Sequence, residues 1–135
     1  MTTTTMPGSA TWTYYHGARF AHLVGGTCLT SQPAAAALYA GARGEVAQVV
    51  VSLAGLTVRA VEADETAGVG PGSWPGDTAA ERAALEAEGV DAIEYRDCAE
   101  DGSEIDCFRL ISARAIAACT TTATLPTAEA VDEWC

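Results

Sequence analysis

The stretch with the clearest potential for chemistry is Tyr14-Tyr15-His16-Gly17, which ends an alternating run that begins at Thr11. Alternation predicts a strand over 11–16 with an imidazole at its end. An imidazole exchanges protons near neutral pH, and a following glycine lets a ligand approach the backbone closely. The alternative is a core aromatic strand, in which His16 is satisfied by a backbone carbonyl and Gly17 starts a turn.

Charge is distributed unevenly along the 135 residues, whose formal net charge is −11. Residues 1–61 carry three arginines and one acid, whereas residues 62–135 carry four arginines and seventeen acids. Such an acidic half repels phosphate backbones and anionic lipid, so neither nucleic acid nor a membrane is expected as a main partner. An anionic small ligand is expected against the first half, where His16 and Arg19 lie.

The cysteines are odd in number and widely spaced, and they contain no Cys-x-x-Cys pair: Cys28, Cys98, Cys107, Cys119 and Cys135. A zinc site is therefore not expected. The first ten residues lack the basic start and apolar middle of a secretory signal, and no apolar run approaches the roughly 18 residues of a membrane span. We therefore expect reduced thiols in a cytoplasmic protein.

The chain length suits one domain. Residues 1–10 are interpreted as a flexible tail, with Thr2 to Thr5 as a frayed end, and residues 11–135 as the folded domain. Periodicity and turn signals predict strands over 11–16, 27–30, 46–53, 57–62, 90–95 and 104–111, and helices over 33–42, 78–88 and 127–134.

The segments between these elements are predicted less regularly. Residues 18–24 are expected to be partly helical, and residues 112–124 are expected to form a transition with a short turn. Residues 63–76 form a glycine- and proline-rich surface loop around Trp74, either a functional lid or a tolerated insertion. Short turns at 53–57 and 97–103 favour antiparallel strand pairs with helices at the side, which is an α+β domain.

The order of these motifs resembles the ADP-ribosyltransferase superfamily, in its compact branch similar to poly(ADP-ribose) polymerase catalytic domains. Tyr15-His16-Gly17 resembles the first motif of that family. Gly26 to Thr30, followed by a helix that contains Leu38-Tyr39-Ala40, resembles its second block. Gly89 to Tyr95 is similar to the Gly-Tyr-Asp-Gly-Ile-x-Tyr segment of bacterial and phage members. The resemblance covers roughly residues 13–117.

The resemblance implies a split antiparallel α+β fold that binds NAD and cleaves its nicotinamide–ribose bond. His16 would hydrogen-bond a ribose hydroxyl, and the backbone of Gly17 would pair with the nicotinamide amide. Tyr39 would stack on the nicotinamide ring, and Arg19 could contact the pyrophosphate. Tyr15 and Thr30 would also belong to the NAD site.

The position of the catalytic carboxylate departs from the family pattern, because Cys107 falls where family members commonly carry a glutamate. Asp106 is adjacent, and Glu104 lies one pleat earlier on the same strand face. A bulge or a small register shift could present either one. If neither carboxylate reaches the ribose, the protein would bind NAD without cleaving it.

Three functions therefore remain open. The first is a mono-ADP-ribosyltransferase or NAD glycohydrolase, of a size that suits a toxin or a phage-encoded effector, with an unidentified acceptor expected to be a protein. A branch that uses arginine, glutamate and serine, here Arg19 and Ser112, is a poorer match. The second is an inactive module of the same fold that binds a nucleotide or a protein. The third is a domain without a ligand, in which Tyr15 and His16 belong to the core.

Overall fold

The valine-rich strand β4 (Glu45–Ser52) lies inside the sheet, between β2 (Thr11–Ala18) and β8 (Cys119–Pro126). Val46, Val49 and Val51 are fully buried. Consecutive valines suit this position because β-branched side chains pack well on both faces of an inner strand. The computed structural model describes residues 2–6, 10–61, 76, 78–98 and 104–135.

The described strands form one mixed sheet of eight in the order β1-β5-β6-β7-β3-β2-β4-β8. All neighbours are antiparallel except β5 and β6. The other strands are β1 (Thr2–Thr5), β3 (Cys28–Thr30), β5 (Thr57–Val61), β6 (Ala92–Cys98) and β7 (Glu104–Leu110). The helices are α1 (Pro33–Ala40), α2 (Ala79–Ala87), α3 (Ala113–Ala117) and α4 (Thr127–Trp134). The predicted α+β class is confirmed.

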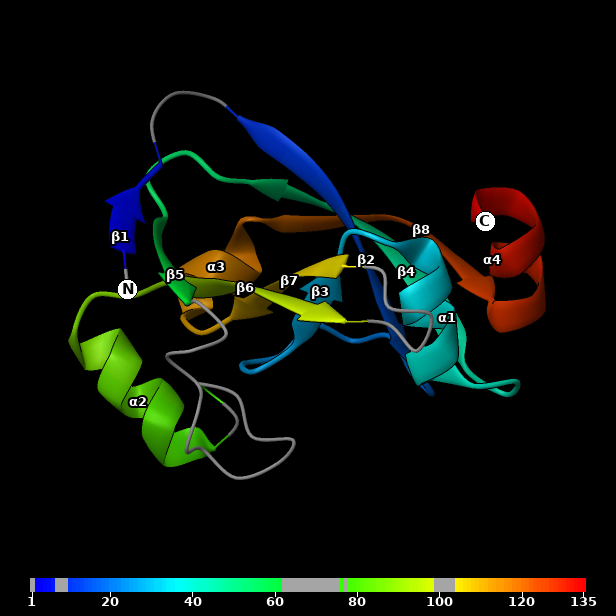
Figure 1. Cartoon of the computed structure of the whole chain (residues 1–135), viewed down its shortest axis with the longest axis horizontal. Helices are drawn as coiled ribbons and strands as arrows, with labels where there is room; N and C mark the ends of the chain where they lie inside the picture. Colours follow the sequence, from blue (N-terminus) through cyan, green and yellow to red (C-terminus); the bar gives the residue numbers. More distant parts are fainter. Residues whose placement is uncertain (1, 7–9, 62–75, 77, 99–103) are drawn as a thin grey trace.

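One side of the sheet, which we call the inner face, carries the larger apolar cluster. Tyr14, Leu29, Val49 and Phe108 belong to this cluster, together with Ala115 of α3. In Figure 1, β2 and β4 run at an angle across β6 and β7. Because the sheet is twisted in this way, side chains from both of its halves meet on the inner face.

The opposite side, which we call the helix face, carries Tyr15, Gly17 and Cys107. Helices α1 and α4 cover its β2–β4 part, where Ala36 and Ala130 pack around the same buried cluster as Tyr15. Figure 1 shows α1 and α4 together at the C-terminal end of the molecule and α2 at the other end.

Helix α1 lies very close to β2 at Gly17. A methyl group at Gly17 would overlap the carbonyl oxygen of Ala36. The helix can approach this closely because its buried residues are alanines. It begins with Pro33 and ends before Gly41, whose φ is 71°. Helix packing therefore requires glycine at position 17.

A buried carboxylate joins three elements at the edge of the inner core. Asp91 is 5% exposed and accepts hydrogen bonds from the Thr57 backbone N–H (2.9 Å) and the Ser112 hydroxyl (2.7 Å). Ser112 in turn accepts from the N–H of Ala115 and caps α3. These bonds compensate the cost of burying a carboxylate and tie β5, β6 and α3 together.

The predicted elements largely match the observed ones, but three segments differ. Thr2–Thr5, expected to be frayed, forms β1 and pairs with β5 from Thr2↔Ala60 to Thr5↔Thr57. The second half of the predicted transition is strand β8, paired with β4. Both are edge strands rich in threonine, whose branched side chain favours extended backbone while its hydroxyl tolerates water. Residues 18–24 contain no helix.

The turn at 53–57 does not join an antiparallel pair, contrary to the prediction. Strand β4 pairs with β2 and β8, and β5 pairs with β1 and β6. Leu53 and Leu56 are buried in the inner core, so the segment crosses from one half of the sheet to the other instead of folding back. The other turn joins β6 and β7, which are antiparallel as predicted. Trp74 and most of the 63–76 loop lie outside the described residues.

Replacing Gly17 with alanine should destabilise the protein by about 3 kcal/mol or more, because the new methyl group meets backbone that cannot rotate away. Urea unfolding of Gly17→Ala measures the loss. Gly25→Ala is the control, since the nearest atom to its methyl would be 3.9 Å away, and it should change stability by less than about 0.5 kcal/mol. Equal stability of the two variants would contradict the packing argument.

Replacing Asp91 with alanine should cost about 3 kcal/mol of unfolding free energy, because Thr57 and Ser112 lose their acceptor inside the protein. Asp132→Ala, on the exposed side of α4, removes the same charge and should change stability little. Thermal or chemical unfolding measures the free energy of unfolding of both variants. A loss of similar size in the two would show that the effect is one of net charge.

Candidate functional site

The sheet is held together at its centre by a short junction between β2 and β3. Tyr15↔Thr30 is the single residue pair in the register of these strands, whereas β3 pairs with β7 at three positions. Beyond that pair, His16, Gly17 and Ala18 have register partners only on β4 within the described part of the chain. The edge of β2 that follows Tyr15 therefore lies beside the start of β3 without a ladder between them.

His16 stands at this junction on the inner face. Its imidazole is half-buried and hydrogen-bonds the backbone of Cys28. Burial lowers the pKa of His16 below the ordinary value of 6.5, and the bond to Cys28 opposes part of this shift. The ring is therefore neutral at pH 7, and a neutral imidazole that donates from one nitrogen keeps a lone pair on the other.

The other predicted NAD residues near β2 lie on the helix face. The hydroxyl of Tyr15 accepts a hydrogen bond from Gln48, and its ring lies against Trp134, 5.5 Å between centroids. Thr30 is 2% exposed, and its hydroxyl accepts from the N–H of Gln32. The side chains of Tyr15 and Thr30 therefore make contacts within the protein. The space that a side chain at Gly17 would fill is taken by the backbone of α1.

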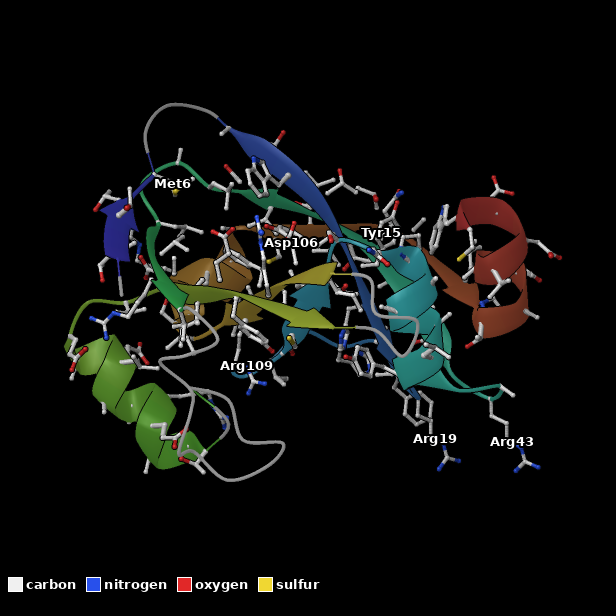
Figure 2. The ribbon with its side chains drawn as sticks, in the orientation of Figure 1. Met6, Tyr15, Arg19, Arg43, Asp106 and Arg109 are labelled. Atoms are coloured by element: carbon white, nitrogen blue, oxygen red, sulfur yellow. The ribbon has the colours of Figure 1, made fainter. Side chains whose placement is uncertain are left out.

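Tyr39 and Arg19 are both exposed. Tyr39, on α1, is 64% exposed on the helix side of the sheet, whereas His16 points to the inner face. The guanidinium of Arg19 lies 5.7 Å from the ring centre of Phe20. Figure 2 shows Arg19 extending away from the sheet, on the side where Arg43 also lies and far from Asp106. These predicted residues therefore do not form one cluster with His16.

Ser112, the serine considered for the alternative branch, is 4% exposed. Its hydroxyl is engaged by Asp91 and by the α3 cap. It is a structural residue in this fold, which argues against that branch.

The candidate carboxylate Asp106 lies on the inner face, the same face as His16. The register places His16 beside Leu29 and Phe108, and Asp106 two residues further along β7. Two strand spacings and two residues correspond to roughly 12 Å between their backbones. Cys107 points the opposite way, is 3% exposed and packs with Tyr95. Glu104 begins β7, and its side chain lies outside the described residues.

Two residues that the sequence did not single out lie near Asp106. Arg96 is opposite it on β6, 3.4 Å away, and Glu94 is opposite the neighbouring Phe108. Burial raises the pKa of the Glu94 carboxyl, the charge of Asp106 adds to the rise, and Arg96 opposes it. Tyr14 completes the group, since burial, then Glu94 and then Asp106 raise the pKa of its hydroxyl. The alternation of residues 90–95 put Glu94 on one strand face, but only the β6–β7 register reveals its neighbours.

The lowered pKa of His16 predicts a loss of stability on acidification. The unfolded chain protonates His16 as the pH falls through about 6.5, whereas the folded protein resists, so folding loses free energy between pH 7.5 and pH 5.5. His16→Gln has no imidazole to protonate, so it should lose less stability over the same range. Urea unfolding at both pH values measures the free energy of unfolding of each protein. Above pH 7.5 the two proteins should show the same dependence of stability on pH. A wild-type protein that gained stability relative to His16→Gln at pH 5.5 would contradict it.

Two hollows beside α4 belong to the helix side. One, of about 460 Å³, is lined by apolar residues of α1 and α4 that include Leu38 and Val131. The other is lined by Trp134 and acidic residues of α4. Neither includes His16, Glu94 or Asp106.

None of the helices in the described ranges has the length and apolar character to cross a membrane. In the same ranges, no three His, Cys, Asp or Glu side chains are grouped so that they could hold a metal ion. Comparison with protein-family models, with curated proteins and with solved structures finds no significant match to this chain.

Proposed function

We propose that this chain is an ADP-ribosyltransferase-like protein that binds NAD beside the β2–β3 junction and cleaves the bond between nicotinamide and ribose. ADP-ribose would pass to water or to a protein acceptor. The observation that carries the proposal is the position of His16: a neutral, half-buried imidazole where the pairing of β2 with β3 ends, on the sheet face that also carries Asp106.

The chemistry of the reaction fits these residue types. As the carbon–nitrogen bond breaks, its electron pair stays with the nicotinamide nitrogen and positive charge develops on the ribose. A carboxylate near that charge stabilises the transition state, and hydrogen bonds to the ribose hydroxyls hold the sugar in place. Asp106 would supply the carboxylate, and the nitrogen of His16 that is not bonded to Cys28 would accept from a ribose hydroxyl.

The nicotinamide is proposed to bind along the β3 side of Gly17. Because α1 covers the α-carbon of Gly17, only the peptide groups at the strand edge could pair with an amide. These groups lie past the Tyr15↔Thr30 pair, where the register with β3 has ended. Tyr39 could then contact the nicotinamide only by reaching around from the helix side, which makes it the weakest member of the proposed site.

One observation favours a second candidate, an inactive module that binds a nucleotide. Cys107, which occupies the position of the family's glutamate, is buried and faces away from His16. Asp106 is on the correct face, but it is about 12 Å from His16 along the sheet. If this separation persists when NAD binds, the protein would bind the dinucleotide without cleaving it.

The proposal predicts that NAD at 100 times its Kd raises the unfolding free energy by about 2.7 kcal/mol, which a melting experiment detects. Free nicotinamide should appear on incubation, measured by chromatography. His16→Gln should lose at least about 90% of the release, the equivalent of one lost hydrogen bond to a reacting group. His22→Gln, at an exposed position on the following loop, is the control and should keep full activity.

The outcomes separate the candidates. A melting shift without nicotinamide release would favour the inactive module, and no shift at all would exclude both. If the wild type releases nicotinamide, Asp106→Asn and Glu104→Gln are made separately. The variant that loses the release identifies the catalytic carboxylate. Full release by His16→Gln would refute the assignment of the site.

A further inference from the structure

Exposed apolar side chains border the hollow between α1 and α4. Leu38 is 71% exposed and Val131 is 45% exposed, and both line this hollow of about 460 Å³. Single exposed apolar residues are common on proteins, whereas a contiguous apolar patch marks an interaction surface. We call this patch the α1–α4 surface, and its apolar members are Ala34, Ala37, Leu38, Val131 and Cys135.

Helices α1 and α4 run in opposite directions along this surface. Thr127, at the start of α4, donates from its hydroxyl to the Gly41 carbonyl (2.7 Å) and from its N–H to the Gly44 carbonyl (3.2 Å), just after α1 ends. The lining of the hollow also includes Ala34 in the first turn of α1 and Cys135 after the last turn of α4. The surface therefore has one end at Gly41 and Thr127 and the other at Ala34 and Cys135.

The two ends carry opposite charges. Arg43 follows Ala42, which lines the hollow, and it extends away from the sheet at the first end (Figure 2). Asp132 lies three residues before Cys135, so the two are neighbours on the helix surface, and about 7.5 Å of helix separate Asp132 from Thr127. Arg43 and Asp132 are both exposed.

Neither charge is neutralised by the part of the chain that the structure describes. Within those residues, Arg43 and Asp132 take part in no ion pair. A two-fold axis that crosses the middle of the surface at right angles to the helices exchanges its ends. Arg43 of one copy then lies against Asp132 of the other, and the reverse contact forms at the opposite end. The surface is therefore complementary to itself in charge.

We infer that the α1–α4 surface is the interface of a two-fold dimer of this chain. The two copies of Leu38 and Val131 form its apolar centre, and two Arg43–Asp132 contacts flank it. A second copy supplies both signs of charge in the required order, whereas a partner of one sign would repel one end of the surface. The inference goes beyond the proposed function, because it involves no NAD and lies on the opposite side of the sheet from His16.

Sedimentation velocity of the full chain without NAD tests the dimer. A reducing agent is present throughout, so that the exposed Cys135 thiol forms no disulfide. The concentration is raised from about 1 μM to about 1 mM, which covers the range of weak and strong association. The wild type should change from one chain to twice that mass within this range. A wild type that stays monomeric at every concentration would overturn the inference.

A charge placed in the apolar centre should prevent dimerisation. Leu38→Glu should weaken it at least about a hundredfold, since both copies lose the burial of an apolar side chain. Val24→Glu is the matched control: Val24 is 60% exposed, lies in the segment between β2 and β3, and is not part of the α1–α4 surface. Both variants should keep the wild-type melting temperature of the monomer. Equal association of Leu38→Glu and Val24→Glu would place the interface elsewhere.

Charge reversal identifies the partner as a second copy. Arg43→Glu and Asp132→Arg each make both flanking contacts repulsive, so each alone should weaken dimerisation about tenfold. An equimolar mixture of the two variants should restore wild-type association, because every flanking contact in the mixed dimer again joins opposite charges.

The same variants exclude an effect of net charge. Asp132→Arg makes the acidic chain less negative, so general repulsion between copies would predict stronger association of this variant. That result, or a mixture that associates no better than the separate variants, would contradict the inference. Nicotinamide release does not enter these measurements, so this inference and the proposed function can fail independently.

Discussion

The close contact between α1 and β2 at Gly17 is the constraint on which the rest of this structure depends. The helix backbone lies directly on the strand at Gly17, which fixes the face of each neighbouring β2 side chain. Tyr15 lies on the helix face, and Tyr14 and His16 lie on the inner face. After Thr30 the chain leaves β3 and enters α1, which ends the pairing of β3 with β2 on the Tyr14 side. On the other side of this pair, His16 lies beside the start of β3, where the described register joins β2 only to β4.

The inner face combines an apolar core with polar groups at its border. Phe108 and Leu29 are fully enclosed, whereas Asp106 and Arg96 on the adjoining strands reach water. Between them, Tyr14 is buried and Glu94 is half-buried, and a charged group in such a place interacts strongly because little water screens it. His16 belongs to the same border. A fold that places an imidazole, a phenol and two carboxylates around one core has the groups needed for binding polar ligands, whichever ligand it takes.

The local structure could be predicted because it depends on neighbours in the sequence. Helix α2, whose Thr78 cap accepts from the N–H of Glu81, and helix α4 over 127–134 were both predicted from the sequence. The valine run of β4 likewise indicated an inner strand. The threonine-rich edges were missed, since Thr2–Thr5 and the start of β8 become strands only when β5 and β4 offer a partner. The parallel pairing of β5 with β6 was missed for the same reason.

The candidate site was likewise predicted only in part from the sequence. From the sequence by itself came the α+β class, the strand that carries His16, the acidic character of the second half and the candidate carboxylate next to Cys107. Only the tertiary structure decided that Gly17 is covered by α1, that Cys107 is buried while Asp106 faces the inner side, and that Glu94 and Tyr14 are its neighbours. The physical reason is register: a period of two residues assigns side chains to faces within one strand, but the pairing between strands far apart in the chain determines which of them meet.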